Sequence, residues 1–338
     1  MLILGIETSC DETAVALVED GQRILSSLVA FQLDIHRPFG GVVPELASRA
    51  HLRALIPLLE RAIREAGVER EAVDGVAFTR GPGLIGALLV GTSLGKALAY
   101  SWGVPLLGIN HLKAHLYAPC LEGATFEFPL AGLIVSGGHT LLVEARSWDA
   151  ARILGSTRDD AAGEAFDKVA GLLGIGFPGG PAIEAVARGG DPGKFQFPRG
   201  MIGSGDLDFS FSGVKTAVRY LLDRLKADGL PVPTADIAAG FQAAVIDVLA
   251  AKFKVAVEET GARTVVLGGG VARNELFRRR VRAMFPSSRY RVLIASADLC
   301  SDNAAMVAGL AGRILKRGRE DDWSIDADPN LPWGDGLL

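Results

Sequence analysis

The chain has 338 residues, of which 49% are hydrophobic and 22% are charged. This apolar content is enough to form a core, so disorder of the whole chain is excluded, and the length predicts about two domains. A formal net charge of −4 disfavours a globally basic nucleic-acid binder, although it leaves room for a local basic patch. The 42 glycines exceed the usual share of about 7% and follow no Gly-X-Y period, which excludes collagen.

The cysteines and the apolar stretches indicate the compartment. Cys10, Cys120 and Cys300 are widely spaced and form neither a disulfide framework nor a CxxC metal site, which indicates a reducing environment. No basic leader precedes the apolar start. The longest apolar stretch, 83–109, is split by Lys96, and the uncharged part is shorter than the ~20 residues of a spanning helix. We expect a cytoplasmic protein without membrane contact.

Hydrophobic periodicity predicts alternating strands and helices along the whole chain. The expected strands are Leu2–Ile6, Ala14–Val18, Ile24–Phe31, Val73–Thr79, Val104–Ile109, Leu130–Val135, Leu141–Ala145, Ala151–Gly155, Thr264–Leu267 and Arg291–Ile294. The expected helices are Pro44–Ala66, Leu84–Tyr100, a short one starting at His111, Asp160–Leu173, Pro181–Arg188, Val214–Asp228, Asp236–Thr260, Val271–Met284 and Asp302–Lys316. The tail, 321–338, is expected to be irregular.

A pattern of strand, polar turn, strand and strand occurs twice, without meaningful identity between the copies. The first copy begins at Leu2 and the second at Leu130. Two α/β lobes that each open with a polar hairpin predict an actin-like ATPase fold, with duplicated mixed sheets and a nucleotide cleft between the lobes. We expect the lobes to comprise residues 1–118 with about 303–338, and residues 119–302.

The polar turns of the two hairpins are candidate anion sites. Ser136-Gly-Gly-His-Thr140 has two glycines after a strand, so its backbone amides can approach an anion closely, but a plain tight turn is an equal alternative. The matching turn at 8–12 offers hydroxyls for phosphate and two carboxylates for a metal, water or an amine. A solvated polar turn is again an equal alternative.

A glycine-rich loop, Gly268-Gly-Gly-Val-Ala-Arg-Asn274, lies between an expected strand and an expected helix. Its glycines allow a flat ring or a ribose to approach the backbone, and Asn274 can offer a bidentate amide. The loop is neither GxGxxG nor a Walker A motif, which disfavours a dehydrogenase and a P-loop enzyme.

His111 and His115 are spaced so that both imidazoles share one helix face and can reach one metal ion. A chance pair is the alternative. Asp302, at the expected start of the last helix, is the obvious third ligand. A zincin protease would need glutamate directly after the first histidine, and that residue is Leu112.

Two charged segments remain. Asp160, Glu164 and Asp167 are expected on one helical stripe, where their mutual repulsion calls for a site or for cationic partners, unless the face is simply solvated. The basic run 278–282 offers guanidinium groups to RNA phosphates, with a solvated helix face as the alternative.

Taken together, motifs covering almost the whole chain in order resemble the tRNA N6-adenosine threonylcarbamoyltransferase family. These motifs are Gly5-Ile-Glu-Thr-Ser-Cys-Asp-Glu-Thr13, Gly40-Gly-Val-Val-Pro-Glu-Leu-Ala-Ser-Arg49, Gly81-Pro-Gly83, the His111/His115 pair, Val135-Ser-Gly-Gly-His-Thr140, 159–168, Phe177-Pro-Gly-Gly-Pro181, Asp208-Phe-Ser-Phe-Ser-Gly213, 268–274 and Ser301-Asp-Asn303.

The resemblance implies transfer of a threonylcarbamoyl group from threonylcarbamoyl-adenylate to N6 of the adenosine 3′ of the anticodon, in tRNAs that read codons starting with A. It implies one divalent metal, iron(II) or else zinc, on His111, His115 and Asp302. It also implies an inert partner subunit of the same fold (TsaB-like) and a small ATPase (TsaE-like). The adenylate or ATP-type ligand would be held by Ile134, Val135, Ser136, Gly137, Gly138, Asp167, Gly180, Glu184 and Asn274.

For catalysis, Asp11 and Glu12 are the candidates to position or deprotonate the incoming amine. One departure from the family pattern is Lys113, where an acidic or small residue is usual; it adds a cation near the metal only if it points toward it. The alternatives to the transferase are an actin-fold small-molecule kinase, a metallopeptidase and an inert scaffold.

Overall fold

The computed structural model describes residues 1–334 and divides the chain into two compact units. Unit 1 comprises Met1–Phe126 and the chain from Ala295 onward, and unit 2 comprises Glu127–Ile294. Unit 2 is therefore an insertion in the sequence of unit 1. The lobe boundaries at residues 118 and 302 stay a prediction; the two units place Asp302 with the first 126 residues. Residues 335–338, the end of the predicted irregular tail, lie outside the described part.

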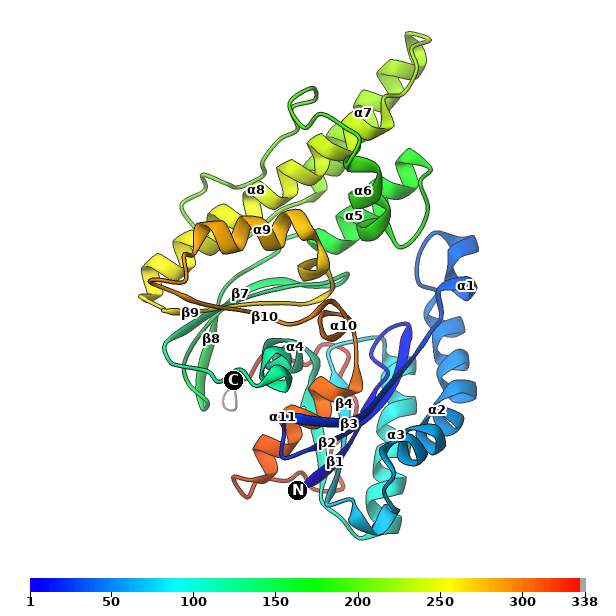
Figure 1. Ribbon diagram of the computed structural model, residues 1–338. Helices are drawn as coiled ribbons and strands as arrows, with labels where there is room; N and C mark the ends of the chain where they lie inside the picture. The colour runs from blue at the N-terminus through cyan, green and yellow to red at the C-terminus, as the bar shows by residue number, and fades with distance from the viewer. Residues whose placement is uncertain (335–338) are drawn as a thin grey trace. The chain divides into compact units, whose positions relative to one another are not determined.

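Unit 1 contains a five-stranded mixed sheet in the order β3-β2-β1-β4-β5 (Figure 1). β2 pairs antiparallel with β1 and β3, whereas β4 pairs parallel with β1 and β5. The strands are β1 (Leu2–Glu7), β2 (Glu12–Glu19), β3 (Arg23–Phe31), β4 (Gly75–Gly81) and β5 (Leu106–Asn110). The helices are α1 (Leu33–His36), α2 (Pro44–Ala66), α3 (Ile85–Trp102), α4 (His111–Tyr117), α10 (Ala297–Cys300) and α11 (Ala304–Leu315).

Side chains alternate between the two faces of this sheet, as in any pleated strand. Leu4 and Ile6 of β1 join the hydrophobic core with residues of α2 and α3. Between them, Gly5 lies against Ala304 and Ala308 of α11, so closely that a Cβ at position 5 would clash with the Ala304 carbonyl. The close approach explains why a glycine interrupts an otherwise apolar strand.

Unit 2 contains a second five-stranded mixed sheet in the order β10-β9-β6-β7-β8. Its strands are β6 (Leu130–Val135), β7 (Thr140–Ser147), β8 (Ala150–Ser156), β9 (Thr264–Gly268) and β10 (Arg291–Ile294). Its helices are α5 (Ala162–Leu173), α6 (Gly179–Ala187), α7 (Ser212–Ala227), α8 (Thr234–Thr260) and α9 (Glu275–Met284).

The two sheets share one topology, which confirms the repeat predicted from the sequence. Each begins with an antiparallel hairpin and a third antiparallel strand, and each adds two parallel strands on the other side of its first strand. The repeated unit is thus a β-β-β meander followed by crossover connections.

The main differences from the prediction concern two predicted helices and two short helices that were not predicted. The helix predicted at Val271–Met284 is a 3₁₀ turn (Gly270–Arg273) followed by α9, and the last helix begins at Ala304 instead of Asp302. In both cases an asparagine side chain accepts a hydrogen bond from the backbone three residues on, which is an N-cap that starts a new helix. The short helices α1 and α10 had no periodic signal and were not predicted.

α8 is the one helix of the described chain that is long and apolar enough to cross a membrane by length and composition. Within its most apolar window, 67% is buried inside the structure. It packs against β6, α6, α7 and α9, as the central helix of a folded unit does. The apolar stretch 83–109 forms α3 and β5.

Candidate metal centre and glycine-rich loops

The helix α4 presents two histidines from the end of β5. Asn110 caps it, because its side-chain oxygen accepts hydrogen bonds from the backbone N–H of Leu112 (3.0 Å) and Lys113 (3.3 Å). His111 and His115 then follow one turn apart, and both are buried. The predicted sharing of one helix face is confirmed: their rings meet edge to face with centroids 4.5 Å apart.

Asp302 completes a triangle of donor atoms. His115 Nε2 lies 3.1 Å from His111 Nε2 and 3.0 Å from Asp302 Oδ1, and His111 Nε2 lies 3.5 Å from the same oxygen. Asp302 sits in the loop between α10 and α11, not in a helix as predicted. Donors of a tetrahedral ion at about 2.1 Å would be separated by about 3.4 Å, so two nitrogens and one carboxylate here suit iron(II) or zinc.

Glu7, the last residue of β1, lies behind this triangle and is fully buried. Its Oε2 is 3.0 Å from His111 Nδ1 and accepts a 2.5 Å hydrogen bond from the Thr79 hydroxyl. Its Oε1 accepts the Ser9 N–H at 2.5 Å. The carboxylate therefore fixes the His111 ring with Nδ1 protonated and Nε2 turned to the other donors, the usual second layer of a metal site. Sequence analysis placed Glu7 in the polar loop and missed this role.

Charge within the cluster determines its protonation. Burial opposes the charged form of His111, but the carboxylates of Asp302 and Glu7 outweigh burial and raise the His111 pKa to about 9. For Glu7, burial is likewise outweighed by His111, which holds the carboxyl pKa below its usual value. Without a bound cation, the pair is thus an imidazolium and a carboxylate.

Asp11 lies in the turn between β1 and β2, Glu12 is the first residue of β2, and the charge of Asp302 acts on Glu12. Both are half-buried. Burial, followed by the charges of Asp302 and Asp11, raises the pKa of the Glu12 carboxyl well above its usual value. A carboxylate of this kind is a stronger proton acceptor than one in water.

In unit 2 the two glycine loops lie side by side. β6 and β9 are parallel neighbours with Ile134 opposite Gly268, so the loops that follow them leave the same edge of the sheet. The close approach is visible at Gly269, which has φ +87° and whose added Cβ would clash with the Val135 carbonyl. Ile134 and Val135 are fully buried in β6.

The turn after β6 is a closed hairpin. Ser136 N–H donates to the His139 carbonyl at 2.8 Å, and the His139 N–H donates to the Ser136 hydroxyl at 3.1 Å. The Ser136 amide is therefore not available to an anion. Gly137 and Gly138 are open at this turn: apart from the adjacent residues in the chain, no atom of the described residues lies within 4 Å of an added Cβ.

Hydrogen bonds connect the remaining predicted ligand residues from one helix to the next. Asp167 of α5 accepts the N–H of Gly179, the first residue of α6, at 2.6 Å. Gly180 follows it. Glu184, one turn along α6, accepts the N–H of Glu275 at 2.8 Å.

The Asn274 amide has protein partners at both of its ends, and its role toward a ligand stays a prediction. Its oxygen accepts the Phe277 N–H at 3.0 Å, and its nitrogen donates to Gln242 at 2.7 Å. Sequence reasoning missed Gln242, since nothing in the α8 pattern distinguishes it from other polar residues. Asn274 caps α9 and ties it to α8.

The acidic stretch has cationic partners, one of the explanations left open by the sequence. Asp160 lies before α5, not on its face, and pairs with Lys168 (2.8 Å) and Lys215 (2.9 Å). Glu164 also pairs with Lys168 at 2.8 Å. Asp159 accepts hydrogen bonds from two hydroxyls and two N–H groups at 210–212, which anchors the start of α7.

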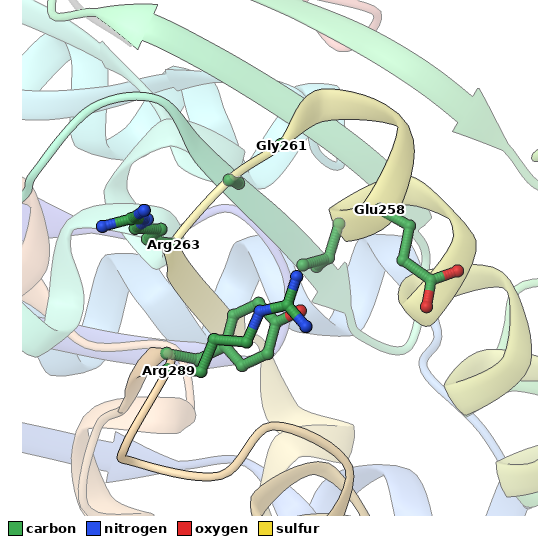
Figure 2. A pocket seen from close by; sticks show the side chains of 7 residues that line it. Glu258, Gly261, Arg263 and Arg289 are labelled. Atoms are coloured by element: carbon green, nitrogen blue, oxygen red, sulfur yellow. The ribbon is translucent and has the colours of Figure 1, made fainter.

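The basic run 278–282 is not a uniform solvated face. Arg278 is buried and donates to the Ala272 carbonyl, and Arg280 lies 3.7 Å from Asp247. Beyond this run, a hollow of about 400 Å³ opens at the end of α8, lined by Glu258, Arg263 and Arg289 (Figure 2). It borders the starts of β9 and β10, the edge of the sheet opposite to the glycine loops.

Lys113 points to the C-terminal segment. Its ammonium lies 5.7 Å from the ring centroid of Trp333 and 3.5 Å from the Gly334 carbonyl. The same segment is fixed to α4 by Asn110, whose amide donates to the Pro332 carbonyl at 3.0 Å.

These observations define an α/β protein of the actin-like ATPase fold with a His-His-Asp cluster in its first unit. Solved structures share the fold at low identity. The activator of 2-hydroxyisocaproyl-CoA dehydratase from Clostridium difficile is 14% identical with a TM-score of 0.52, over 96% of this chain and all of that one. HypF from T. kodakarensis is 15% identical with a TM-score of 0.60, over 94% of this chain and 48% of that one.

Sequence comparison identifies the family. The family model described as tRNA N6-adenosine threonylcarbamoyltransferase matches residues 23–309. Proteins of that name from Thermomicrobium roseum and Thermosipho africanus are 49% and 46% identical, over 98% of this chain in each case and 97% and 99% of theirs. The chain belongs to the tRNA N6-adenosine threonylcarbamoyltransferase family.

Proposed function

We propose that this chain transfers the threonylcarbamoyl group from threonylcarbamoyl-adenylate to N6 of the adenosine 3′ of the anticodon, in tRNAs that read codons starting with A. Its family membership carries the proposal, with 49% identity to a curated transferase over 98% of the chain. As a member of this family the chain is a transferase that acts on tRNA. No observation favours the kinase or the metallopeptidase, and Leu112 stands where the peptidase base would be.

We propose that His111, His115 and Asp302 hold one divalent ion, iron(II) or zinc. The triangle of donors at 3.0–3.5 Å and the Glu7 carboxylate behind it support this assignment. Such an ion supplies Lewis-acid polarisation of the carbamoyl oxygen or a grip on the threonyl group.

The protein must also remove a proton from a poorly basic amine. In the proposed step the N6 nitrogen attacks the carbamoyl carbon, the bond from that carbon to the phosphate oxygen breaks, and AMP leaves. Glu12 accepts the N6 proton, and Asp11 positions the amine. The raised pKa of the Glu12 carboxyl supports its role as the base, because the best base has a pKa near the working pH.

The leaving AMP is assigned to the glycine loops of unit 2. The space around Gly137 and Gly138, which carry no side chain, suits a close approach of its phosphate to the backbone. Asp167, Gly180 and Glu184 lie on helices that the hydrogen bonds described above connect, and Asn274 caps the next helix. These residues are proposed to form the adenylate site.

We further propose that the chain works in the cytoplasm with an inert subunit of the same fold and a small ATPase. The test is reconstitution with these partners, unmodified tRNA, threonine, bicarbonate, ATP and the enzyme that makes the adenylate. Digestion and mass analysis of the tRNA should reveal threonylcarbamoyl-adenosine, and His111→Ala should abolish it. No product with separately verified partners would overturn the transferase assignment.

The role of the turn is tested separately. Asp11→Ala should retain adenylate binding and lose transfer. Normal tRNA modification by Asp11→Ala would show that this carboxylate is not needed.

A further inference from the structure

His51 is a fully buried histidine of α2 that touches the turn carrying the two candidate catalytic acids. Its Nε2 lies 3.0 Å from the Cys10 carbonyl oxygen, and its Nδ1 lies 2.7 Å from the Thr13 hydroxyl. One imidazole thus contacts the residue before Asp11 and the residue after Glu12.

The chemistry of the two contacts fixes the imidazole in one form. A carbonyl oxygen can only accept, so Nε2 carries the hydrogen and donates it to Cys10. Nδ1 is then an acceptor for the Thr13 hydroxyl, and the amide nitrogen of Gln32 is a second donor 3.3 Å away. Burial, the largest influence, lowers the His51 pKa, which agrees with a neutral ring that can donate and accept at once.

A second layer holds the ring in place. The Gln32 side chain also donates toward the Ala47 carbonyl, and its oxygen lies 3.1 Å from His36 Nε2. His36 is fully buried, and its Nδ1 accepts the Val43 N–H at 3.3 Å. The orientation of His51 is therefore set by a continuous polar network that reaches the segment before α2.

We propose that His51 is a positioning residue, which holds the Asp11–Glu12 turn in its reactive geometry by binding both ends of it. The inference rests on the proposed roles of Asp11 and Glu12. A turn backbone held at one point can pivot, whereas two anchors three positions apart, at Cys10 and Thr13, fix the direction in which the intervening carboxylates project. Small displacements of catalytic groups lower turnover strongly.

The test uses variants that remove one anchor each, in the reconstituted transfer reaction. Thr13→Val removes only the hydroxyl donor. His51→Asn keeps an acceptor near the Nδ1 position, His51→Gln keeps a donor near the Nε2 position, and His51→Leu removes both. We expect kcat to fall about tenfold for each single-anchor variant and about 100-fold for His51→Leu. The KM for the adenylate should stay within about threefold, and metal content should stay unchanged.

A matched control is Thr92→Val, which removes a buried hydroxyl that has no hydrogen-bond partner among the described residues. It should leave kcat unchanged. If His51→Leu fails to fold, the kcat values of Thr13→Val, His51→Asn and His51→Gln test the proposal instead. Wild-type kcat in Thr13→Val and in both amide variants, with a lowered melting temperature, would show a purely structural histidine and overturn the proposal. Inactive wild-type protein would instead contradict the proposed function, and an active Asp11→Ala would contradict only the role of the turn.

Discussion

His111 Nδ1 lies 3.0 Å from Glu7 Oε2, so a carboxylate at the end of the first strand orients an imidazole 104 residues later in the chain. Two further donors, the Ser9 N–H and the Thr79 hydroxyl, hold that carboxylate in place. The geometry of the proposed metal site therefore depends on Glu7, a residue that is not one of its ligands.

Glu7→Gln should weaken metal binding. The amide is uncharged and directs an N–H group at donors that need an acceptor, so His111 becomes less basic and less well oriented. We expect metal affinity to fall about 10–100-fold, measured by competition with a chromogenic chelator. Glu144→Gln is the matched control, because Glu144 is also a buried acid but pairs with Arg146 and Arg152 in unit 2. Equal metal affinity in wild type and Glu7→Gln would contradict the prediction.

Metal-depleted protein should lose stability as the pH rises. The His111 pKa is raised to about 9 in the folded protein, above its ordinary value near 6.5 in an unfolded chain. The stabilisation from the imidazolium is therefore complete below pH 6.5 and is lost as pH rises through 9. We expect the melting temperature of chelator-treated protein to fall by about 5 °C between pH 6.5 and 9.5.

Two comparisons check the origin of this pH dependence. His111→Asn should flatten the profile, because no imidazole remains to titrate at this position. Metal-loaded protein should also lose the alkaline decline, since a metal ion replaces the proton on Nε2. A decline that persists unchanged in His111→Asn would assign it to another group.

Gly163→Ala should disturb the nucleotide loop. An added Cβ would clash with the Ser136 carbonyl and lie 2.8 Å from the Gly137 Cα, so the turn after β6 must shift. We expect adenylate affinity to fall at least about tenfold, with metal affinity unchanged, by isothermal titration with a non-hydrolysable adenylate analogue.

The same helix provides the control for that substitution. Gly171 also lies in α5, but within residues 1–334 no atom outside its chain neighbours and its own helix backbone lies within 4 Å of an added Cβ. Gly171→Ala should keep adenylate affinity and raise the free energy of unfolding by about 0.5–1 kcal/mol, the gain in helix propensity. Equal adenylate affinity in Gly163→Ala and Gly171→Ala would contradict the prediction that the clash disturbs the nucleotide loop.

Lys113→Met should have little effect on the metal. The Lys113 ammonium lies over Trp333 and near the Gly334 carbonyl, so its charge is directed to the C-terminal segment. We expect metal affinity to stay within about threefold of wild type, since methionine preserves the apolar stem. A larger increase in affinity would indicate that the charge acts on the metal site after all.

The repeat and the succession of strands and helices along the chain follow from patterns that operate over short distances. Apolar runs, polar hairpin turns and the spacing of His111 and His115 are all local, so periodicity was enough to predict them. Helix starts were less accurate wherever a cap interrupted an apolar pattern. Asn274 caps α9 in the middle of a segment that was predicted to be one continuous helix. Asn303 caps α11, which was predicted to begin earlier.

The contacts that refine the site could not be predicted in this way. Glu7 meets His111, and Asn274 meets Gln242, only because separate elements are packed together. In the sequence, Asp160 cannot be distinguished from an acid that binds a ligand, but in the structure its partners are two lysines. The sequence alone indicates which acidic residues need an explanation. Tertiary packing then determines whether each one contacts a ligand, a cationic side chain or backbone N–H groups.

The three donors of the His-His-Asp cluster are also synthesised at different stages of translation. His115 and Asp302 lie 187 positions apart, and all of unit 2 is encoded between them. A ribosome synthesises both histidines before any of unit 2 and delivers the carboxylate only after the last strand of unit 2. A nascent chain stalled within unit 2 thus offers two donors at most, and the complete three-donor set marks a chain that has been translated past the insertion.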